Sequence, residues 1–169
     1  ERRFRLPTAV MNDANAAAAG ELHWGGIGAD HFVCITLGTG IGAGVVVDGR
    51  VVEGANFLAG EIGHVPYRPD GPPCACGQRG CLETFASGRG MIRRYLAATN
   101  PASGLSSAEG RDEADQLHGD ELVRLAKSGD NAATRVLTEA AEALGLAVAY
   151  MIRLLDVNHV VLAGGVIKM

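Results

Sequence analysis

Long hydrophobic runs are missing from this sequence of 169 residues, because no apolar stretch reaches the roughly 18 residues that a membrane-spanning helix needs. Positive charge is also scarce. The 15 lysines and arginines are scattered and are outnumbered by 19 acidic residues, which gives a net charge of −4. Such a pattern offers no basic face for nucleic acid or for an anionic membrane surface. We therefore expect neither a membrane nor a nucleic acid among the partners.

Cysteine is sparse too, and its distribution is uneven. Of the four cysteines, Cys74, Cys76 and Cys81 lie within eight positions, whereas Cys34 falls in an apolar run and is expected in the core. Cysteines at such short spacing are typical of metal ligands in a reducing compartment rather than of a disulfide scaffold. The sequence therefore predicts a cytoplasmic protein. With 47% apolar residues it can form one domain with a sizeable core.

Residues 60–83, GEIGHVPYRPDGPPCACGQRGCLE, contain four candidate metal ligands. They are His64, Cys74, Cys76 and Cys81, with the spacing H-x9-C-x-C-x4-C. Four such ligands on a short loop can close a tetrahedron around one Zn²⁺, which is the pattern of a structural site. Gly77 and Gly80 stand between the last cysteines, where a tight turn needs backbone angles that glycine adopts at low cost. Three unrelated thiols and a core histidine fit this spacing poorly, so we predict a zinc knuckle over residues 61–83.

Two carboxylates flank these metal ligands. Glu61 precedes His64 by three residues, and Glu83 follows Cys81 by two. They could be solvated surface glutamates, which is the usual place of such residues. The glycines and apolar residues around them instead favour a packed wall that presents carboxylates. The local sequence leaves both interpretations open.

A short apolar run at residues 6–11 is followed by Asn12 and Asp13 and then by residues of high helix propensity up to residue 22. We therefore expect a strand that leads directly into a helix, with Asn12 or Asp13 at the helix N-terminus. Both residue types are good N-caps. A carboxylate at this place is also stabilised by the helix dipole and could have a second role. The local sequence fits a plain N-cap and a carboxylate with a chemical role equally well.

A buried strand is predicted at residues 32–37, and a glycine-rich stretch follows it. Gly38, Gly40 and Ala43 match the dinucleotide fingerprint G-x-G-x-x-G/A, but that fingerprint must open a helix. Here the sequence continues as a β-branched run, an Asp-Gly pair and a second β-branched run, which predicts a hairpin. The glycines therefore belong to a strand-to-strand turn. Its free N–H groups and the Thr39 hydroxyl predict contact with a phosphate, whereas a plain hairpin would need fewer glycines.

The rest of the chain alternates between helices and one more strand. Helices are expected at residues 87–98, 120–127 and 131–155, with a polar loop at residues 100–116. The apolar stripe of the last helix, from Val136 to Leu155, is expected in the core. A buried strand is predicted at residues 157–163, and it ends at Gly164 and Gly165, where the backbone can approach another group closely. This order predicts an α/β fold with a mixed sheet and flanking helices.

Four motifs together resemble the ROK family of repressors, open reading frames and kinases, which contains bacterial sugar kinases related to glucokinase. They are N-D-A-N-A-A-A, L-G-T-G-I-G-A-G, the segment from G-E-I-G-H to C-x-C-G-x-x-G-C-L-E, and L-A-G-G-V. The resemblance implies the actin-like ATPase fold, with two ribonuclease-H-like halves around a cleft. Residues 1–169 resemble most of the second, larger domain, and the N-terminal domain is not in this sequence.

The resemblance also implies roles for individual residues. Asp13 matches the catalytic base that accepts the proton of the sugar hydroxyl, and His64 would bind zinc through one ring nitrogen and sugar through the other. The remaining matches fall into two groups. Sugar-binding residues are Asn12, Glu61, His64 and Glu83; nucleotide-binding residues are Gly38, Thr39, Gly40 and Gly42 for phosphate, with Gly164 and Gly165 on the adenosine side. ATP with Mg²⁺ is the implied phosphoryl donor.

The sequence departs from the family pattern in one respect, because the early D-x-G-[ST] turn that helps to hold Mg²⁺ and ATP is not found in it. We therefore expect a fragment, or a degenerate member, with no useful kinase activity on its own. The leading hypothesis is phosphorylation of glucose at its 6-hydroxyl. A sugar-responsive transcriptional repressor and an N-acetylmannosamine or other amino-sugar kinase are the alternatives. Family members imply a homodimer or homotetramer.

Overall fold

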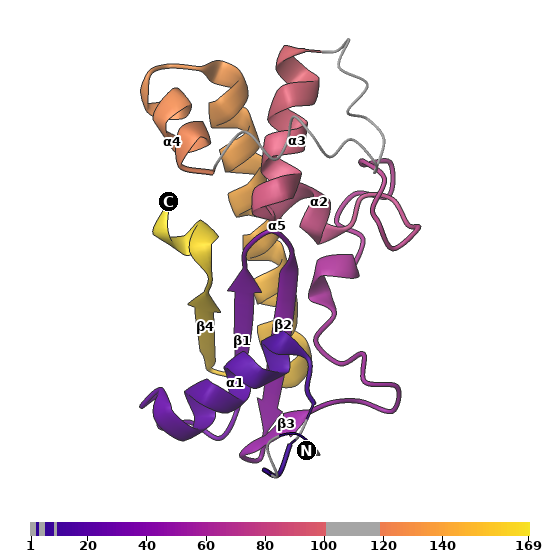
Figure 1. Ribbon diagram of the computed structural model, residues 1–169. Helices are drawn as coiled ribbons and strands as arrows, with labels where there is room; N and C mark the ends of the chain where they lie inside the picture. Colours follow the sequence, from indigo (N-terminus) through magenta and orange to yellow (C-terminus); the bar gives the residue numbers. More distant parts are fainter. Residues whose placement is uncertain (1–2, 4–5, 9, 101–118) are drawn as a thin grey trace.

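The computed structural model describes residues 3, 6–8, 10–100 and 119–169. Its centre is a four-stranded mixed sheet with the order β3-β2-β1-β4 (Figure 1). β1 (Phe32–Leu37) pairs antiparallel with β2 (Ile41–Val47) and parallel with β4 (His159–Ala163), and β3 (Arg50–Val52) continues from β2 as a hairpin. Asp48 and Gly49 both have positive φ at the β2–β3 turn, as the Asp-Gly signal predicts. The mixed α/β fold predicted from the sequence is confirmed.

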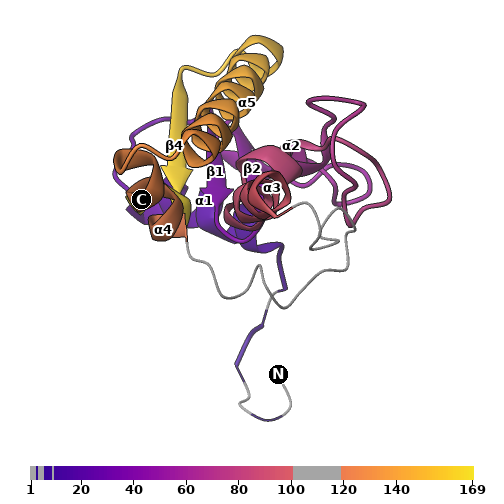
Figure 2. The ribbon, with the colours of Figure 1, turned by 90° about the horizontal axis from the view of Figure 1, so that it is seen from above.

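Helices cover both faces of this sheet. The side chains of β1 alternate, so that Val33, Ile35 and Leu37 join the larger core while Phe32 and Cys34 join a smaller one. The smaller core lies under α1 (Asp13–Trp24). The larger core lies under α5 (Asn131–Leu155), on the opposite face (Figures 1 and 2). Cys34 is fully buried, as expected.

Three further helices pack at one end of the sheet, beside α5. They are α2 (Leu82–Ala86), α3 (Gly88–Thr99) and α4 (Gly119–Lys127). The predictions for α3 and α4 are confirmed to within one residue, whereas α2 was not expected. Ser87 ends α2 and caps α3, because its side chain accepts the Gly90 N–H. Most of the loop predicted at residues 100–116 lies outside the described residues.

The long helix α5 has the bounds that its periodicity predicts. Asp130 caps it by accepting the N–H groups of Ala132 and Ala133, and the Tyr95 hydroxyl donates to the same carboxylate. The apolar stripe is only partly core, however. Val136 and Ala140 are buried, but Ala141 and Ile152 are exposed, because they point away from the helix face that carries the buried residues.

Two predicted strands also differ from the structure. Residues 6–8 and 10–12 form no strand before α1, and Leu6 and Val10 are exposed, because this segment pairs with none of the four strands of the described sheet. β4 begins at His159 rather than at residue 157, and it is the edge strand of the described sheet, so that His159 and Leu162 are exposed. In the part of the chain that the structure describes, no helix has the length and apolarity to cross a membrane.

α1 lies close against β2 because Gly42 and Gly44 of the strand have no side chain. A Cβ at Gly44 would overlap the Ala18 Cβ and would lie 2.6 Å from the Ala14 carbonyl oxygen. Ala14 and Ala18 are themselves small and almost fully buried. The first turn of α1 is therefore fixed relative to residues 42–44, which matters for the site described below.

Gly44→Ala should lower the free energy of unfolding by about 1–3 kcal/mol, because an added methyl group forces the helix away from the strand. Gly20→Ala in the same helix is the control. A Cβ at Gly20 meets no atom within 4 Å, so this variant should gain about 0.5–1 kcal/mol from helix propensity. Urea unfolding of both variants measures the difference. Equal stability of the two would show that α1 does not pack against β2 as described.

Candidate functional site

The outer edge of β2 is where the GEIGH segment attaches to the sheet. β3 pairs only with residues 45–47, so that Ile41 and Ala43, which pair with β1 on one side, have no strand on their outer side among the described residues. The Ala43 N–H donates instead to the Gly60 carbonyl oxygen at 3.1 Å. A Cβ at Gly60 would collide with the Ala43 carbonyl oxygen, and one at Gly63 with that of Ile41. These two glycines therefore let η1 (Ile62–His64) lie directly on the strand edge.

Glu83 is held at the same edge. Its Oε2 accepts the Ile41 N–H at 3.0 Å, which satisfies a backbone donor that would otherwise lack a strand partner. Glu83 is half-buried and lies in the first turn of α2. Of the two interpretations left open by the sequence, the packed wall is the one found for this carboxylate.

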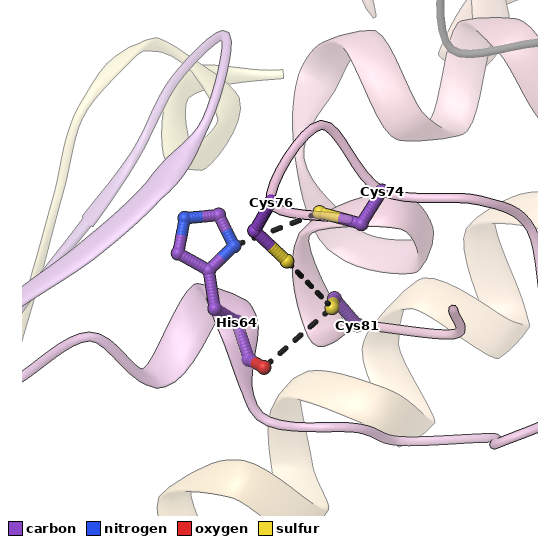
Figure 3. A group of neighbouring side chains, drawn as sticks. All are labelled: His64, Cys74, Cys76 and Cys81. Atoms are coloured by element: carbon purple, nitrogen blue, oxygen red, sulfur yellow. Dashed lines mark hydrogen bonds between the residues drawn. The ribbon is translucent and has the colours of Figure 1, made fainter. Parts of the chain in front are cut away.

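The four predicted metal ligands lie together (Figure 3). The ligand atoms of His64, Cys74, Cys76 and Cys81 all lie within 4.8 Å of one another. The His64 Nδ1 is 3.6 Å from the Cys74 Sγ, and the Cys76 and Cys81 sulfurs are also 3.6 Å apart. In a tetrahedral zinc site with Zn–S near 2.3 Å, neighbouring sulfurs lie about 3.8 Å apart, so these separations fit one ion.

The loop that carries the cysteines is shaped by backbone hydrogen bonds and two glycines. The Cys74 N–H donates to the Gln78 carbonyl, and the Gly77 N–H donates to the Cys74 carbonyl. Gly77 and Gly80 both have positive φ, as the sequence predicts. A Cβ at Gly80 would also overlap the Arg68 carbonyl oxygen. The three sulfurs are thus brought together by a turn that tolerates no side chain at Gly80.

The thiols of this cluster have perturbed proton affinities. Burial raises the pKa of the Cys81 thiol to about 12 and also raises the pKa of the Cys74 thiol. A hydrogen bond from the Gln78 backbone N–H instead lowers the pKa of the Cys76 thiol. Metal ligation requires thiolates, so a bound divalent cation must displace protons here. The donor set of one imidazole and three thiols is that of a Zn²⁺ site.

His64 connects this cluster to a carboxylate. Its Nδ1 faces the thiols, and its Nε2 lies 3.9 Å from the Glu61 Oε2. Both side chains are about one third exposed, at 34% and 38%. One ring nitrogen is thus available to a metal and the other to a second ligand beside Glu61.

At the start of α1, one residue caps the helix and the next presents an exposed carboxylate. Asn12 is the N-cap, because its Oδ1 accepts the N–H groups of Ala14 and Asn15 at 2.9 and 3.2 Å. Asp13 is exposed, and its Oδ1 accepts the Ala14 N–H, which is its one hydrogen bond within the described residues. Since Ala14 also packs on Gly42 and Gly44, Asp13 is anchored to the same stretch of β2, residues 41–44, as Glu61 and Glu83.

The two predicted glycine turns are adjacent. Residues 38–40 join β1 to β2, and the Gly88 N–H at the start of α3 donates to the Gly38 carbonyl. Gly164 has φ of 104°, and a Cβ there would overlap the Leu37 carbonyl oxygen. The carboxyl ends of parallel β1 and β4 therefore present both turns together, which is where α/β sheets bind ligands. Gly42 lies within β2 under α1, and a Cβ added there would lie 3.0 Å from the Ala14 Cβ.

Sequence reasoning missed Asn15 and the contact of α3 with the glycine turn. Asn15 is only 4% exposed, and within the described residues its Oδ1 has no hydrogen-bond partner. The second asparagine of N-D-A-N was a usable signal for it. The Ser-Gly pair after α2 similarly marks a helix start that places Gly88 against Gly38.

The model of the ROK family matches residues 1–169. The chain belongs to the ROK family. It is 39% identical to a glucokinase from Halalkalibacterium halodurans over 99% of its own length and 52% of that protein. It is also 37% identical to an N-acetylmannosamine kinase from Citrobacter koseri, over 95% of this chain and 50% of that protein. A putative xylose repressor from Caldicellulosiruptor is 35% identical, over 96% of this chain and 41% of the repressor. This chain thus spans about half the length of the curated relatives it matches.

Solved ROK structures have the same fold. A ROK hexokinase from Thermus thermophilus superposes with a TM-score of 0.81 at 38% identity, over 96% of this chain and 50% of the other. A ROK glucokinase from Streptomyces griseus, solved with glucose and AMPPNP, superposes with a TM-score of 0.77 at 38% identity, over 99% of this chain and 55% of the other. The mixed sheet is thus that of the actin-like ROK sugar kinases, as the motifs imply.

Proposed function

We propose that the complete protein is an ATP-dependent sugar kinase that phosphorylates the 6-hydroxyl of glucose, and that residues 1–169 form most of its larger domain. The observation that carries this proposal is the convergence on residues 41–44 of β2. Asp13, Glu61 with His64, and Glu83 all attach there, beside the glycine turns at the ends of β1 and β4. Glucokinases among the relatives support the same reading.

Phosphoryl transfer needs positioning and charge stabilisation more than covalent chemistry. We assign Asp13 as the general base that accepts the proton of the attacking sugar hydroxyl. Its exposed carboxylate sits on a rigid helix start, because Asn12 takes the capping role and Ala14 packs on β2. A base fixed in this way can meet a hydroxyl without a reorganisation of the backbone.

The sugar would be held by Asn12, Glu61, His64 and Glu83. Glu83 uses Oε2 for the Ile41 N–H, so that its other oxygen can accept a sugar hydroxyl. His64 would turn Nε2 to the sugar while Nδ1 ligates zinc. Zinc ligation at Nδ1 would fix the orientation of the imidazole ring, and we assign the metal no role in the transfer itself.

ATP would lie across the two glycine turns. Thr39 and Gly40 would offer backbone N–H groups and the Thr39 hydroxyl to the phosphates, whereas Gly38 would shape the turn, because its own N–H already donates to the Gly40 carbonyl. Gly164 and Gly165 would border the adenosine. Gly42 belongs to this set by motif, but its place under α1 makes packing its main constraint. Mg²⁺ bound to the ATP phosphates would neutralise their charge.

A coupled assay of ADP release by the complete protein, with a panel of hexoses and amino sugars, tests the activity. Release driven by glucose is the expected result. Release driven by N-acetylmannosamine instead would move the substrate to the amino sugars, which the kinase from Citrobacter koseri makes the second candidate. Glucose binding without turnover would overturn the kinase proposal and favour a sugar-responsive repressor, as the xylose-repressor relative suggests.

A further inference from the structure

The turn between β1 and β2 is held at both ends by the corner between α2 and α3 (Figure 1). At the β2 end, the Ile41 N–H donates to the Glu83 Oε2 at 3.0 Å. At the β1 end, the Gly38 carbonyl accepts the Gly88 N–H at 2.9 Å. Inside the turn, the Gly38 N–H donates to the Gly40 carbonyl at 3.0 Å. Two anchors from one corner thus fix the position of the turn.

Gly40 lies directly against the Glu83 anchor. A Cβ added at Gly40 would lie 2.5 Å from the Glu83 Oε2. Beyond the adjoining residues of the turn, the one other described atom within 4 Å of it is the Cδ of the same carboxylate, at 3.5 Å. A carboxylate oxygen cannot stay so close to a methyl group, and it is the end of a flexible side chain. The carboxylate would therefore move aside and release the Ile41 N–H, while the backbone of the turn would stay in place.

Gly38 belongs to the same turn but has no such neighbour. A Cβ at Gly38 would meet no atom within 4 Å among the described residues. Neither Gly38 nor Gly40 has the positive φ that glycine adopts at low cost, so alanine fits the backbone at both positions. The missing side chain at Gly40 is thus needed to keep the Glu83 carboxylate in place, whereas the missing side chain at Gly38 is not.

We propose that Gly40 is a positioning residue for Glu83 and acts through it on sugar binding, although its motif assigns it to the phosphates of ATP. With Oε2 bound to the Ile41 N–H, the carboxylate is restricted to one orientation. An acceptor that is fixed in advance loses less entropy when it binds a sugar hydroxyl. The inference rests on the proposed function for its ligand, because it is there that Glu83 is assigned to the sugar.

Isothermal titration calorimetry of the complete protein with glucose, in the absence of nucleotide, tests this role. Gly40→Ala should weaken glucose binding by about tenfold or more, as expected when a hydrogen bond to a charged acceptor is lost. Gly38→Ala is the matched control, because it adds the same methyl group to the same turn without reaching Glu83. Its affinity for glucose should stay within about twofold of the wild type. Both variants should keep a single cooperative thermal transition, which separates lost affinity from lost fold.

Hydrogen–deuterium exchange at the Ile41 amide gives a second readout that needs no ligand. Exchange should be about tenfold faster in Gly40→Ala than in the wild type and unchanged in Gly38→Ala, because only the first variant displaces the Glu83 acceptor. Equal glucose affinity in the two variants, whether retained or reduced, would overturn the proposal, as would unchanged exchange at Ile41 in Gly40→Ala. Absence of glucose binding by the wild type would instead overturn the proposed function. Faster Ile41 exchange in Gly40→Ala would still support Gly40 as the residue that positions Glu83.

Discussion

Replacement of Asp13 by Asn in the complete protein is expected to lower kcat by about 10²–10⁴-fold, the usual contribution of a general base. Asn keeps the shape of the side chain and can still accept the Ala14 N–H that Asp13 Oδ1 accepts at 2.8 Å. It cannot take the proton of the attacking hydroxyl. Sugar affinity, measured by calorimetry without ATP, should stay within a few-fold, because the other assigned sugar contacts are intact. Coupled ADP-release kinetics measure the loss of turnover.

Asp120→Asn is the matched control for this prediction. Asp120 is also an exposed aspartate in the first turn of a helix, α4, but it lies outside the candidate site. It should leave kcat unchanged, so that a general effect of lost charge at helix starts is separated from base catalysis. A normal kcat in Asp13→Asn would remove Asp13 from the mechanism and leave the helix-start aspartate without an assigned chemical role.

Local patterns in the sequence were sufficient for the parts of the site that lie close together along the chain. The spacing of His64, Cys74, Cys76 and Cys81 predicts a cluster because a short loop with two forced turns has few other ways to close. The Asp-Gly pair at the β2–β3 turn fixes a hairpin for a similar reason. In both cases the backbone angles of one or two residues decide the structure.

Contacts between distant segments were not predictable in this way. Ile41 and Glu83 are 42 positions apart, and their hydrogen bond exists only because β3 ends at Val52 and leaves the strand edge open. Gly42 and Gly60 are glycines for packing reasons that appear only when α1 and η1 are in place. The sequence therefore suggested what several residues do, whereas β2 as their common anchor became visible only in three dimensions.

Cys76→Ser in the complete protein is expected to remove most of the zinc, since a four-ligand site loses its closure when one thiolate is replaced. Sugar affinity should fall by about tenfold or more, because metal ligation at Nδ1 would orient the His64 ring that we assign to sugar binding and that also faces Glu61. Elemental analysis and calorimetry measure the two effects. Cys34→Ala, which removes a buried thiol outside the cluster, should retain its zinc. Unchanged zinc in Cys76→Ser would refute the ligand assignment, and lost zinc with normal sugar affinity would separate His64 from sugar binding.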